Sequence, residues 1–235
     1  MNKQFLTRVG IMVVSLVASA QLASADYIVA TVGGYGPWQT DRGGEFTLLA
    51  NGGPNLSAYV GGKTSNIEQN DTFQTFCLEK NEYIEKNTLY YATISGAALR
   101  GGNNTNLGDP ISQGTAWLYS QFAKGTLTGY DYDTETGRHA SAAALQNTIW
   151  WLEDEDTAAP DNIFTTAVNI QFGTTNAKND YNGKGVSVLN IWGDAGHTVY
   201  KQDMLIATPT PIPAAAWLLG SGILGLVGVR RKMRA

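Results

Sequence analysis

The first part of the chain alternates between short segments rich in β-branched and aromatic residues and clusters of Gly, Asn and Pro. β-Branched and aromatic side chains suit the pleated surface of a sheet, and the clusters supply the backbone angles that tight turns require. The pattern predicts strands at Tyr27–Val32, Glu45–Ala50, Ser57–Val60, Thr72–Glu79 and Leu89–Ser95.

In the middle of the chain, the spacing of the apolar positions changes to that of a helix. A first helix is predicted by Ile111, Thr115, Leu118 and Phe122, with Pro110 at its start and Gly125 just past its end. A second helix is predicted by Ala142, Leu145, Ile149 and Leu152, and it must stop before Pro160.

Strand-like composition returns after a polar loop. We expect Val186–Trp192 and His197–Ala207 to form strands that pair with the N-terminal sheet. Two helices therefore interrupt a strand-rich chain. The predicted class is α+β: a β-sandwich or barrel that carries a two-helix insertion.

Residues 1–25 have the parts of a secretion signal in their required order. Lys3 and Arg8 carry positive charge, the stretch 11–18 is apolar, and Ala23-Ser24-Ala25 forms an A-x-A cleavage site. A buried helix at the start of a domain would need neither the basic residues before it nor the small residues after it. We therefore expect export, with the mature protein beginning at Asp26.

Residues 208–235 have the layout of a sorting tail with a C-terminal hydrophobic anchor helix. Pro211 and Pro213 precede the apolar run 214–229, and a basic cluster follows it. At about 1.5 Å per residue this run spans roughly 24 Å, so it is short for the ~30 Å core of a bilayer. The basic end should stay in the cytoplasm, which leaves the domain 26–207 on the outer side of the inner membrane.

This tail resembles the sorting signal of the PEP-CTERM family, in which a Pro-x-Pro motif precedes a short apolar span and an arginine-rich end. Here the motif is Thr210-Pro211-Ile212-Pro213, where the family most often has Val-Pro-Glu-Pro or Val-Pro-Leu-Pro. The resemblance implies that an exosortase cuts near the prolines and passes the protein to the cell surface or extracellular matrix. A plain membrane anchor is the alternative.

Charge limits the partners of the exported part. All 20 acidic residues lie there with about 10 of the 16 basic ones, because the two ends of the chain hold the other basic residues. The resulting excess of negative charge argues against DNA, RNA or anionic lipid, since phosphate binding needs a basic surface. The length of this part suits a single domain, and we expect no cofactor and no metal.

Cys77 is the only cysteine of the chain, so no internal disulfide can form. In an oxidising compartment, a lone cysteine suggests pairing with another chain, a reactive thiol or another covalent use; a small buried hydrophobe is the alternative. Strand alternation places Phe76 and Leu78 on one face and Cys77 on the other. If Phe76 and Leu78 fill the core of the sheet, the helical insertion is the candidate cover for Cys77.

Gln146 lies beside the apolar stripe of the second predicted helix. It shares an edge of that helix with Ala142, Ala143 and Trp150. A glutamine in this position is usually a solvated flanking residue. However, the two alanines would let another backbone approach its amide closely, and Trp150 would shield the amide from water.

Two segments together resemble the signatures of thioester domains in bacterial surface adhesins: Phe76-Cys77-Leu78-Glu79 and Leu145-Gln146-Asn147-Thr148-Ile149-Trp150. The first signature is aromatic-Cys-hydrophobic, and the second is hydrophobic-Gln-x-x-hydrophobic-Trp. Each motif is short, and their occurrence with a single cysteine makes the resemblance more specific. Asn147 departs from the family, in which a small residue tends to follow the glutamine.

The resemblance implies that Cys77 and Gln146 join as an internal thioester with loss of ammonia, with Phe76 and Trp150 supporting the site. An amine or hydroxyl of a partner would then displace the sulfur. Because this chemistry is used once, we expect a covalent adhesin acting on a surface or polysaccharide partner, and not a turnover enzyme. The rival hypothesis is a non-covalent structural or glycan-binding matrix protein with an ordinary thiol.

A Cys-His hydrolase is a weaker alternative. His139 and His197 are the only histidines, and no nucleophile motif surrounds Cys77.

Acidic residues give two further weak signals. Asp131, Asp133, Glu135 and Gly137 faintly resemble a calcium loop, but the glycine is one position late and Ala142 stands where a bidentate glutamate should be. We therefore predict a solvated loop there, and a solvated helix end for the acidic run 153–156.

Overall fold

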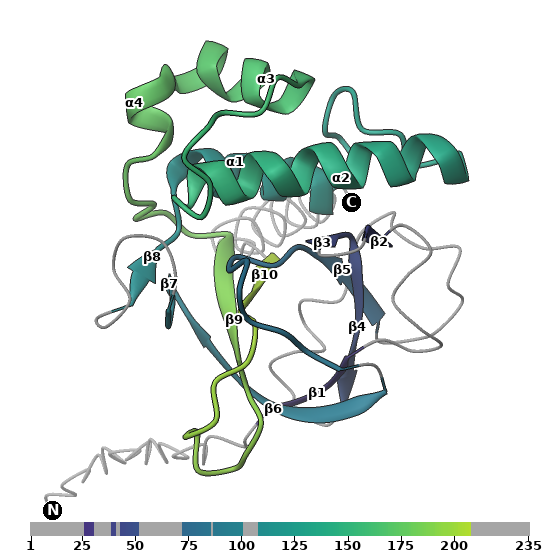
Figure 1. The fold of residues 1–235 in the computed structure, drawn as a ribbon, viewed down its shortest axis with the longest axis vertical. Coiled ribbons are helices and arrows are strands. Elements are labelled where there is room, and N and C mark those ends of the chain that lie inside the picture. Colours follow the sequence, from purple (N-terminus) through teal and green to yellow (C-terminus); the bar gives the residue numbers. More distant parts are fainter. Residues whose placement is uncertain are drawn as a thin grey trace, which may run out of the picture.

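The computed structural model describes residues 26–30, 39–40, 43–51, 72–85, 87–100 and 108–207 (Figure 1). It combines helices and strands, which confirms the predicted α+β class. Three predictions fall outside these residues: the signal sequence 1–25, the strand Ser57–Val60 and the sorting tail with Pro211 and Pro213. No helix within the described ranges is long and apolar enough to span a membrane.

Antiparallel strands form one large sheet in the order β10-β9-β6-β1-β4-β5. Its strands are β1 (Asp26–Ala30), β4 (Phe46–Asn51), β5 (Thr72–Thr75), β6 (Thr88–Ser95), β9 (Val186–Trp192) and β10 (Met204–Ala207). Two short ladders pair β2 (Gln39–Thr40) with β3 (Gly43–Gly44), and β7 (Ala97–Ala98) with β8 (Asp109–Pro110). The C-terminal strands join the N-terminal sheet, as predicted, because β9 pairs with β6.

The two edges of the large sheet meet just after β5. The Leu205 N–H donates to the Phe76 carbonyl, and the Leu78 N–H donates to the Asp203 carbonyl, both at 3.0 Å. Cys77 lies between these bonds and forms a bridge with Met204. Because pairing of the edge strands satisfies their backbone groups, the segment around Cys77 is held between distant parts of the chain.

Between β8 and β9, where the chain is described throughout, helices cover one end of the sheet (Figure 1). The two predicted helices are confirmed as α1 (Gln113–Ala123) and α2 (Glu135–Leu152). Each begins at a hydroxyl cap. The Ser112 Oγ accepts from the Thr115 N–H at 3.1 Å, and the Thr134 Oγ1 accepts from the Gly137 N–H at 3.2 Å.

Two further helices, α3 (Ile163–Phe172) and α4 (Thr174–Ala177), replace much of the polar loop that we expected. The sequence conceals α3 because its threonines and asparagine are weak helix formers and only Phe164, Thr165 and Val168 are buried. The sequence does contain a residue of a type that commonly caps helices, Asn162, directly before α3. The Asn162 side chain accepts from the N–H groups of Phe164 and Thr165 at 2.9 and 3.1 Å.

The strand predicted at His197–Ala207 is shorter than expected and comprises only Met204–Ala207. Asp194 Oδ1 accepts from the N–H groups of Thr198 and Val199, each at 2.8 Å, and so forms a loop. His197 has a φ of 55°, which is incompatible with a strand.

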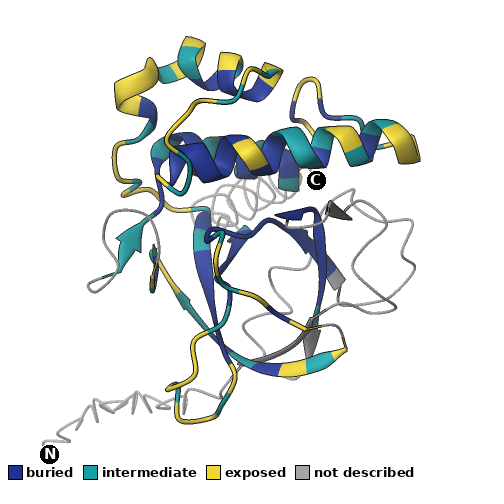
Figure 2. Cartoon of the chain, in the orientation of Figure 1, coloured by how far each residue is buried: buried dark blue, intermediate teal, exposed yellow. Residues whose placement is uncertain are grey.

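Two clusters of buried side chains fill the interior (Figure 2). In the first cluster, Leu118, Phe122, Leu145 and Ile149 of the helices pack with Val188 and Leu205 of the sheet. The second cluster is built mainly from the strands and includes Phe46, Leu48, Phe73, Leu189, Ile191, Met204 and Ile206. Among its buried members, only Trp150 comes from a helix. Trp150 therefore links α2 to the strand-lined core.

The prediction of a solvated helix end at residues 153–156 is wrong for Glu153. This residue is buried, and its Oε1 accepts from the N–H of Ser112, the residue that caps α1, at 3.1 Å. Burial raises the pKa of Glu153 from an ordinary 4.5 to about 7, although hydrogen bonds oppose the shift. The carboxyl thus joins the end of α2 to the start of α1.

The other acids of this run pair with lysines. Asp154 pairs with Lys178 and Asp156 with Lys80, while Glu155 accepts from the Lys80 N–H at 2.9 Å. These contacts offset the unfavourable placement of negative charge at a helix C-terminus.

Glu153→Gln should flatten the dependence of stability on pH. Because the folded pKa of about 7 exceeds the unfolded 4.5, the native state holds a proton that the unfolded state releases. The free energy of unfolding therefore falls as pH rises through this window, and the variant lacks that loss. Urea denaturation across the window measures the slope. An unchanged slope in Glu153→Gln would mean that the carboxyl is already ionised in the folded protein.

Candidate functional site

Cys77 and Gln146 are in contact, although 69 positions separate them in the chain. Cys77 follows β5 in the stretch that closes the sheet, and Gln146 projects from α2. The Cys77 Sγ lies 3.3 Å from the Gln146 Oε1. Both side chains are buried, with 0% and 1% of their surface exposed. The fold thus brings the two sequence motifs together.

Hydrogen bonds fix both ends of the Gln146 amide. Its Oε1 accepts from the backbone N–H groups of Cys77 and Gly44, each at 3.3 Å, and it faces the thiol at the same distance. Its Nε2 donates to the Cys77 carbonyl at 2.9 Å. Two backbone donors on one carbonyl oxygen resemble an oxyanion hole, because both would stabilise negative charge that develops on that oxygen.

A pair of glycines in β3 supplies one of these donors. Gly44 has a φ of 100°, which only glycine adopts readily. A Cβ on Gly43 would lie 2.6 Å from Trp150 Cη2 and 2.7 Å from Gln146 Cγ. The backbone at Gly43 therefore lies too close to α2 for a side chain, and the φ of Gly44 disfavours one there. Ala142 and Ala143 suggested that another backbone approaches the Gln146 amide closely. That backbone is β3.

Strand alternation holds around Cys77, which lies on the opposite face from Phe76 and Leu78. Phe76 and Leu78 pack with the helices, and the Phe76 ring lies edge to face with Phe122 at 4.9 Å. Cys77 belongs instead to the strand-lined cluster. The thiol also meets α2, through Gln146 and Trp150, so the helical insertion covers Cys77 as expected.

One face of α2 carries the polar residues that build the site. Arg138, Gln146 and Trp150 are separated by multiples of four residues, lie on one stripe and are buried. Lys80 Nζ lies 5.3 Å from the centroid of the Trp150 ring and is paired with Asp156. The indole and the lysine together form a cover near the thiol.

The surroundings keep the Cys77 thiol protonated. Burial raises its pKa well above the usual value, and the carboxyl of Glu79 acts in the same direction. The Trp150 indole N–H opposes this shift by favouring the thiolate. Among the described residues, the Trp150 Nε1 has no hydrogen-bond partner of regular geometry. A thiolate formed here would therefore meet a donor that is not otherwise engaged.

Glu79 ties the segment after Cys77 to the chain that leads into β10. Its Oε2 accepts from the Asp203 N–H at 2.7 Å, and its carbonyl accepts from the Gln202 amide at 3.0 Å. Burial, and then the charge of Asp203, raise the pKa of Glu79 well above its usual value. Burial is the largest cause of the raised pKa of Cys77, ahead of the charge of Glu79.

A buried ion pair attaches the glycine pair to α2. Glu45 directly follows Gly44, and its carboxylate accepts from two guanidinium nitrogens of Arg138, with Nε at 2.9 Å. The Tyr130 hydroxyl donates to the same carboxylate at 2.6 Å. Because Arg138 shares a stripe with Gln146, this pair fixes the Gly44 N–H relative to the amide. No sequence motif marked these residues; the one available signal was an acid directly after two glycines.

The remaining candidates lie elsewhere. His197 stacks on Trp192 with ring centroids 5.1 Å apart, and His139 lies on α2 two turns before Gln146, about 10 Å along the helix axis. In the described part of the chain, the hydrogen bond of the Cys77 thiol goes to Gln146 and not to a histidine. Asn147 is exposed, so its size does not affect the approach of sulfur to the amide.

The acidic loop before α2 forms a turn. Asp131 Oδ2 accepts from the Thr134 hydroxyl at 2.6 Å, and Oδ1 accepts from the N–H groups of Thr134 and Asp133 at 3.0 and 2.9 Å. These bonds lower the pKa of Asp131. Over the described ranges, no group of three His, Cys, Asp or Glu residues is arranged to hold a metal ion.

Gly43→Ala should disrupt the site. Because the new methyl would collide with Trp150 and Gln146, we expect a loss of about 1–3 kcal/mol in stability. The displaced backbone should also weaken the hydrogen bond from Gly44 to Gln146. Urea denaturation measures the loss of stability. Gly96→Ala is the matched control, since a Cβ there meets nothing within 4 Å; equal behaviour of the two variants would contradict the close packing.

Glu45→Gln should lower the free energy of unfolding by about 3–5 kcal/mol, because it leaves the Arg138 charge buried without its partner. Asp154→Asn removes a pair whose acid is 43% exposed and should cost less than about 1 kcal/mol. Chemical denaturation of both variants tests the difference. A small effect at Glu45 would show that β3 does not depend on this ion pair.

Comparison of the chain with protein-family models, with curated proteins and with solved structures finds no match. The assignment of a function therefore depends on the residues and geometry of the chain itself.

Proposed function

We propose that the chain is an exported surface protein in which Cys77 and Gln146 form an internal thioester. The thioester would attach the protein covalently to an amine or hydroxyl of a surface or polysaccharide partner. One observation carries the proposal: the Cys77 sulfur lies 3.3 Å from the oxygen of the Gln146 amide, and both groups are buried. The β-barrel-like closure of the sheet and the helical insertion supply the two elements that hold these groups together.

Formation of the thioester is an intramolecular acyl transfer. The sulfur attacks the amide carbon of Gln146, the thiol proton passes to the amide nitrogen, and the C–N bond breaks to release ammonia. An amide is a poor acyl donor in water, but two rigid elements that align the groups can supply about 7–11 kcal/mol of the barrier. The Gly44 and Cys77 N–H groups lie beside the oxygen that gains charge, and the Cys77 carbonyl lies beside the departing nitrogen.

Burial supports storage of the activated bond. Exclusion of water slows hydrolysis of a reactive intermediate, and Trp150, which is 5% exposed, lies against the glycine pair beside Gln146. Lys80 is the lysine closest to Cys77 in sequence and is itself an amine. Its ammonium is held by Asp156 and by the Trp150 ring.

Opening of the thioester consumes the partner's nucleophile. The amine or hydroxyl attacks the acyl carbon, the C–S bond breaks, and the proton of the nucleophile restores the Cys77 thiol. The products are an amide or ester to Gln146 and a free cysteine. The indole N–H of Trp150 would favour the departing thiolate. Ammonia is not restored, so each molecule reacts once, as a covalent adhesin and not as a turnover enzyme.

The sequence at the two ends suggests where this reaction takes place. The signal-like segment 1–25 supports export, and the PEP-CTERM-like tail with Pro211 and Pro213 supports transient anchoring in the inner membrane followed by exosortase sorting. We propose that the domain 26–207 then acts at the cell surface or in an extracellular matrix such as that of a biofilm.

Intact-mass measurement of the exported chain, expressed with its own signal sequence, tests the thioester. We expect a mass lower than that of the mature sequence by one ammonia. Methylamine should then add its own mass and release one thiol. Cys77→Ala and Gln146→Glu should show no deficit and no reaction with methylamine, because each lacks one partner of the bond.

Alkylation must be carried out after denaturation. The buried Cys77 thiol, with its raised pKa, would resist iodoacetamide in the folded protein whether or not the thioester had formed. Wild-type protein of unaltered mass, folded and fully alkylated on denaturation, would contradict the thioester and favour a non-covalent matrix module with an ordinary cysteine.

A further inference from the structure

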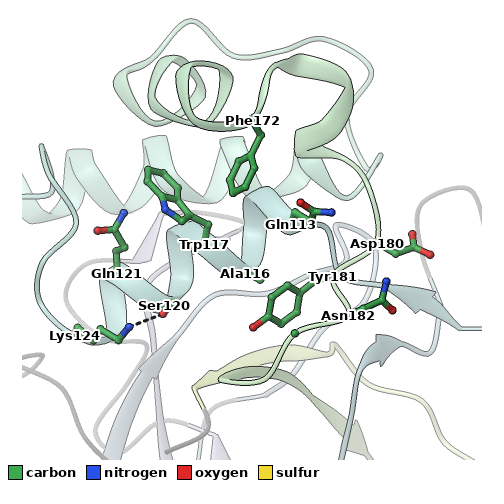
Figure 3. Close-up of a pocket in the computed structure, with 11 residues that line it drawn as sticks. Gln113, Ala116, Trp117, Ser120, Gln121, Lys124, Phe172, Asp180, Tyr181 and Asn182 are labelled. Carbon is green, nitrogen blue, oxygen red and sulfur yellow. Dashed lines mark hydrogen bonds between the residues drawn. The ribbon is translucent and has the colours of Figure 1, made fainter. Parts of the chain in front are cut away.

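A pocket with a volume of about 620 Å³ lies along the outer face of α1 (Figure 3). One side of it is a stripe of α1 that includes Gln113, Trp117 and Gln121. The other side is formed by Phe172, at the end of α3, and by the segment 180–183. The pocket shares no residue with the Cys77–Gln146 site, and its volume lies within the usual range of small-molecule sites.

Backbone hydrogen bonds fix the wall formed by the segment 180–183. The Tyr181 N–H donates to the Ile111 carbonyl and the Gln113 N–H donates to the Asn179 carbonyl, both at 2.8 Å. The Tyr181 hydroxyl donates to the Lys184 carbonyl at 2.9 Å, and Gly183 lies so close that a Cβ would be 2.5 Å from the Tyr181 ring. The wall is therefore preformed, which reduces the entropy that a ligand must overcome.

Aromatic rings provide the apolar part of the lining. Trp117 and Phe172 meet edge to face, with centroids 6.0 Å apart and planes at 90°. Tyr181 lies opposite them on the loop (Figure 3). All three are only partly buried, so their rings present flat apolar surface to the pocket as well as to the core.

The polar part of the lining consists largely of uncharged groups. Gln113, Gln121 and Asn182 bring side-chain amides, each of which can donate and accept hydrogen bonds. Lys124 is the basic residue of the lining, and its Nζ bonds Ser120 Oγ at 3.0 Å. Asp180 adds a carboxylate on the loop side (Figure 3). The one basic and one acidic residue of the lining therefore give no net positive charge that would attract an anion.

We propose that this pocket binds a short neutral oligosaccharide without covalent chemistry. A sugar ring has an apolar face of C–H groups and a rim of hydroxyls, which match flat aromatic rings and amides that both donate and accept. A lipid tail would leave the amides unsatisfied, and a phosphate ligand needs more basic groups than Lys124 alone. The edge-to-face packing of Trp117 and Phe172 also leaves no row of parallel ridges for a proline-rich peptide.

The proposal does not rest on the thioester. Isothermal titration of the exported chain with cello-, xylo-, manno- and chito-oligosaccharides tests it directly. We expect at least one series to bind, and we expect Trp117→Ala and Asn182→Ala each to weaken that binding by about tenfold or more. Asn182 is exposed, so its replacement reports on binding even if loss of the Trp117 ring disturbs the fold.

Two control variants distinguish binding in this pocket from binding at another aromatic surface or at the thioester. Tyr83→Ala removes an aromatic side chain that is 61% exposed and outside the pocket, and Cys77→Ala abolishes any thioester. Both should bind the sugar like the wild type. The proposal is overturned if none of the four series binds, if Asn182→Ala binds as tightly as Tyr83→Ala, or if only a proline-rich peptide occupies the pocket.

Discussion

The side-chain oxygen of Gln146 joins three parts of the molecule that are distant in the chain. It belongs to α2 and accepts hydrogen bonds from Gly44 in β3 and from Cys77, where the sheet closes. A buried amide is costly unless its oxygen and nitrogen both find partners. These partners are the backbone groups of the strands, so the position of α2 over the sheet depends on a polar contact as well as on apolar packing. The Cys77 and Gln146 side chains therefore meet as part of the fold.

Burial has two opposite effects on the chemistry of this site. It raises the pKa of the Cys77 thiol, which lowers the fraction of the nucleophilic thiolate. It also excludes the water that would hydrolyse a thioester. A reaction that occurs once in the life of the molecule can be slow, provided that its product persists. The proposed thioester would therefore gain persistence at the expense of speed.

Local patterns predicted the elements better than they predicted their contacts. The stripe of Leu145 and Ile149 marked α2, and the β-branched run of Val186–Trp192 marked β9 with the bounds that the structure has. The side of the sheet on which Cys77 lies could not be read from alternation. A period of two separates two faces but does not say which of them a distant helix will cover. That choice depends on contacts between residues far apart in sequence.

The candidate site shows the same limit. Cys77, Gln146 and Trp150 were identifiable because they form short motifs with a recognisable order. The groups that hold them were not, because a glycine pair and a buried acid such as Glu45 have many uses, and Glu45 finds its partner Arg138 93 positions away. Similarly, Glu153 belongs to an acidic run that looks like solvated surface, and only the neighbouring start of α1 explains its burial.

The charge of residues 26–207 limits how the proposed partner could be captured. Its excess of acidic residues gives no long-range attraction to anionic surfaces, and screening confines other charge effects to about 8 Å at physiological salt. Capture must then depend on short-range contacts, and a slow covalent step needs a partner that stays nearby. A preformed pocket for a neutral glycan would supply that residence by raising the effective concentration of nucleophiles on the same polymer. The pocket on α1 would then determine which surface is met, and the pair of Cys77 and Gln146 would make the attachment permanent.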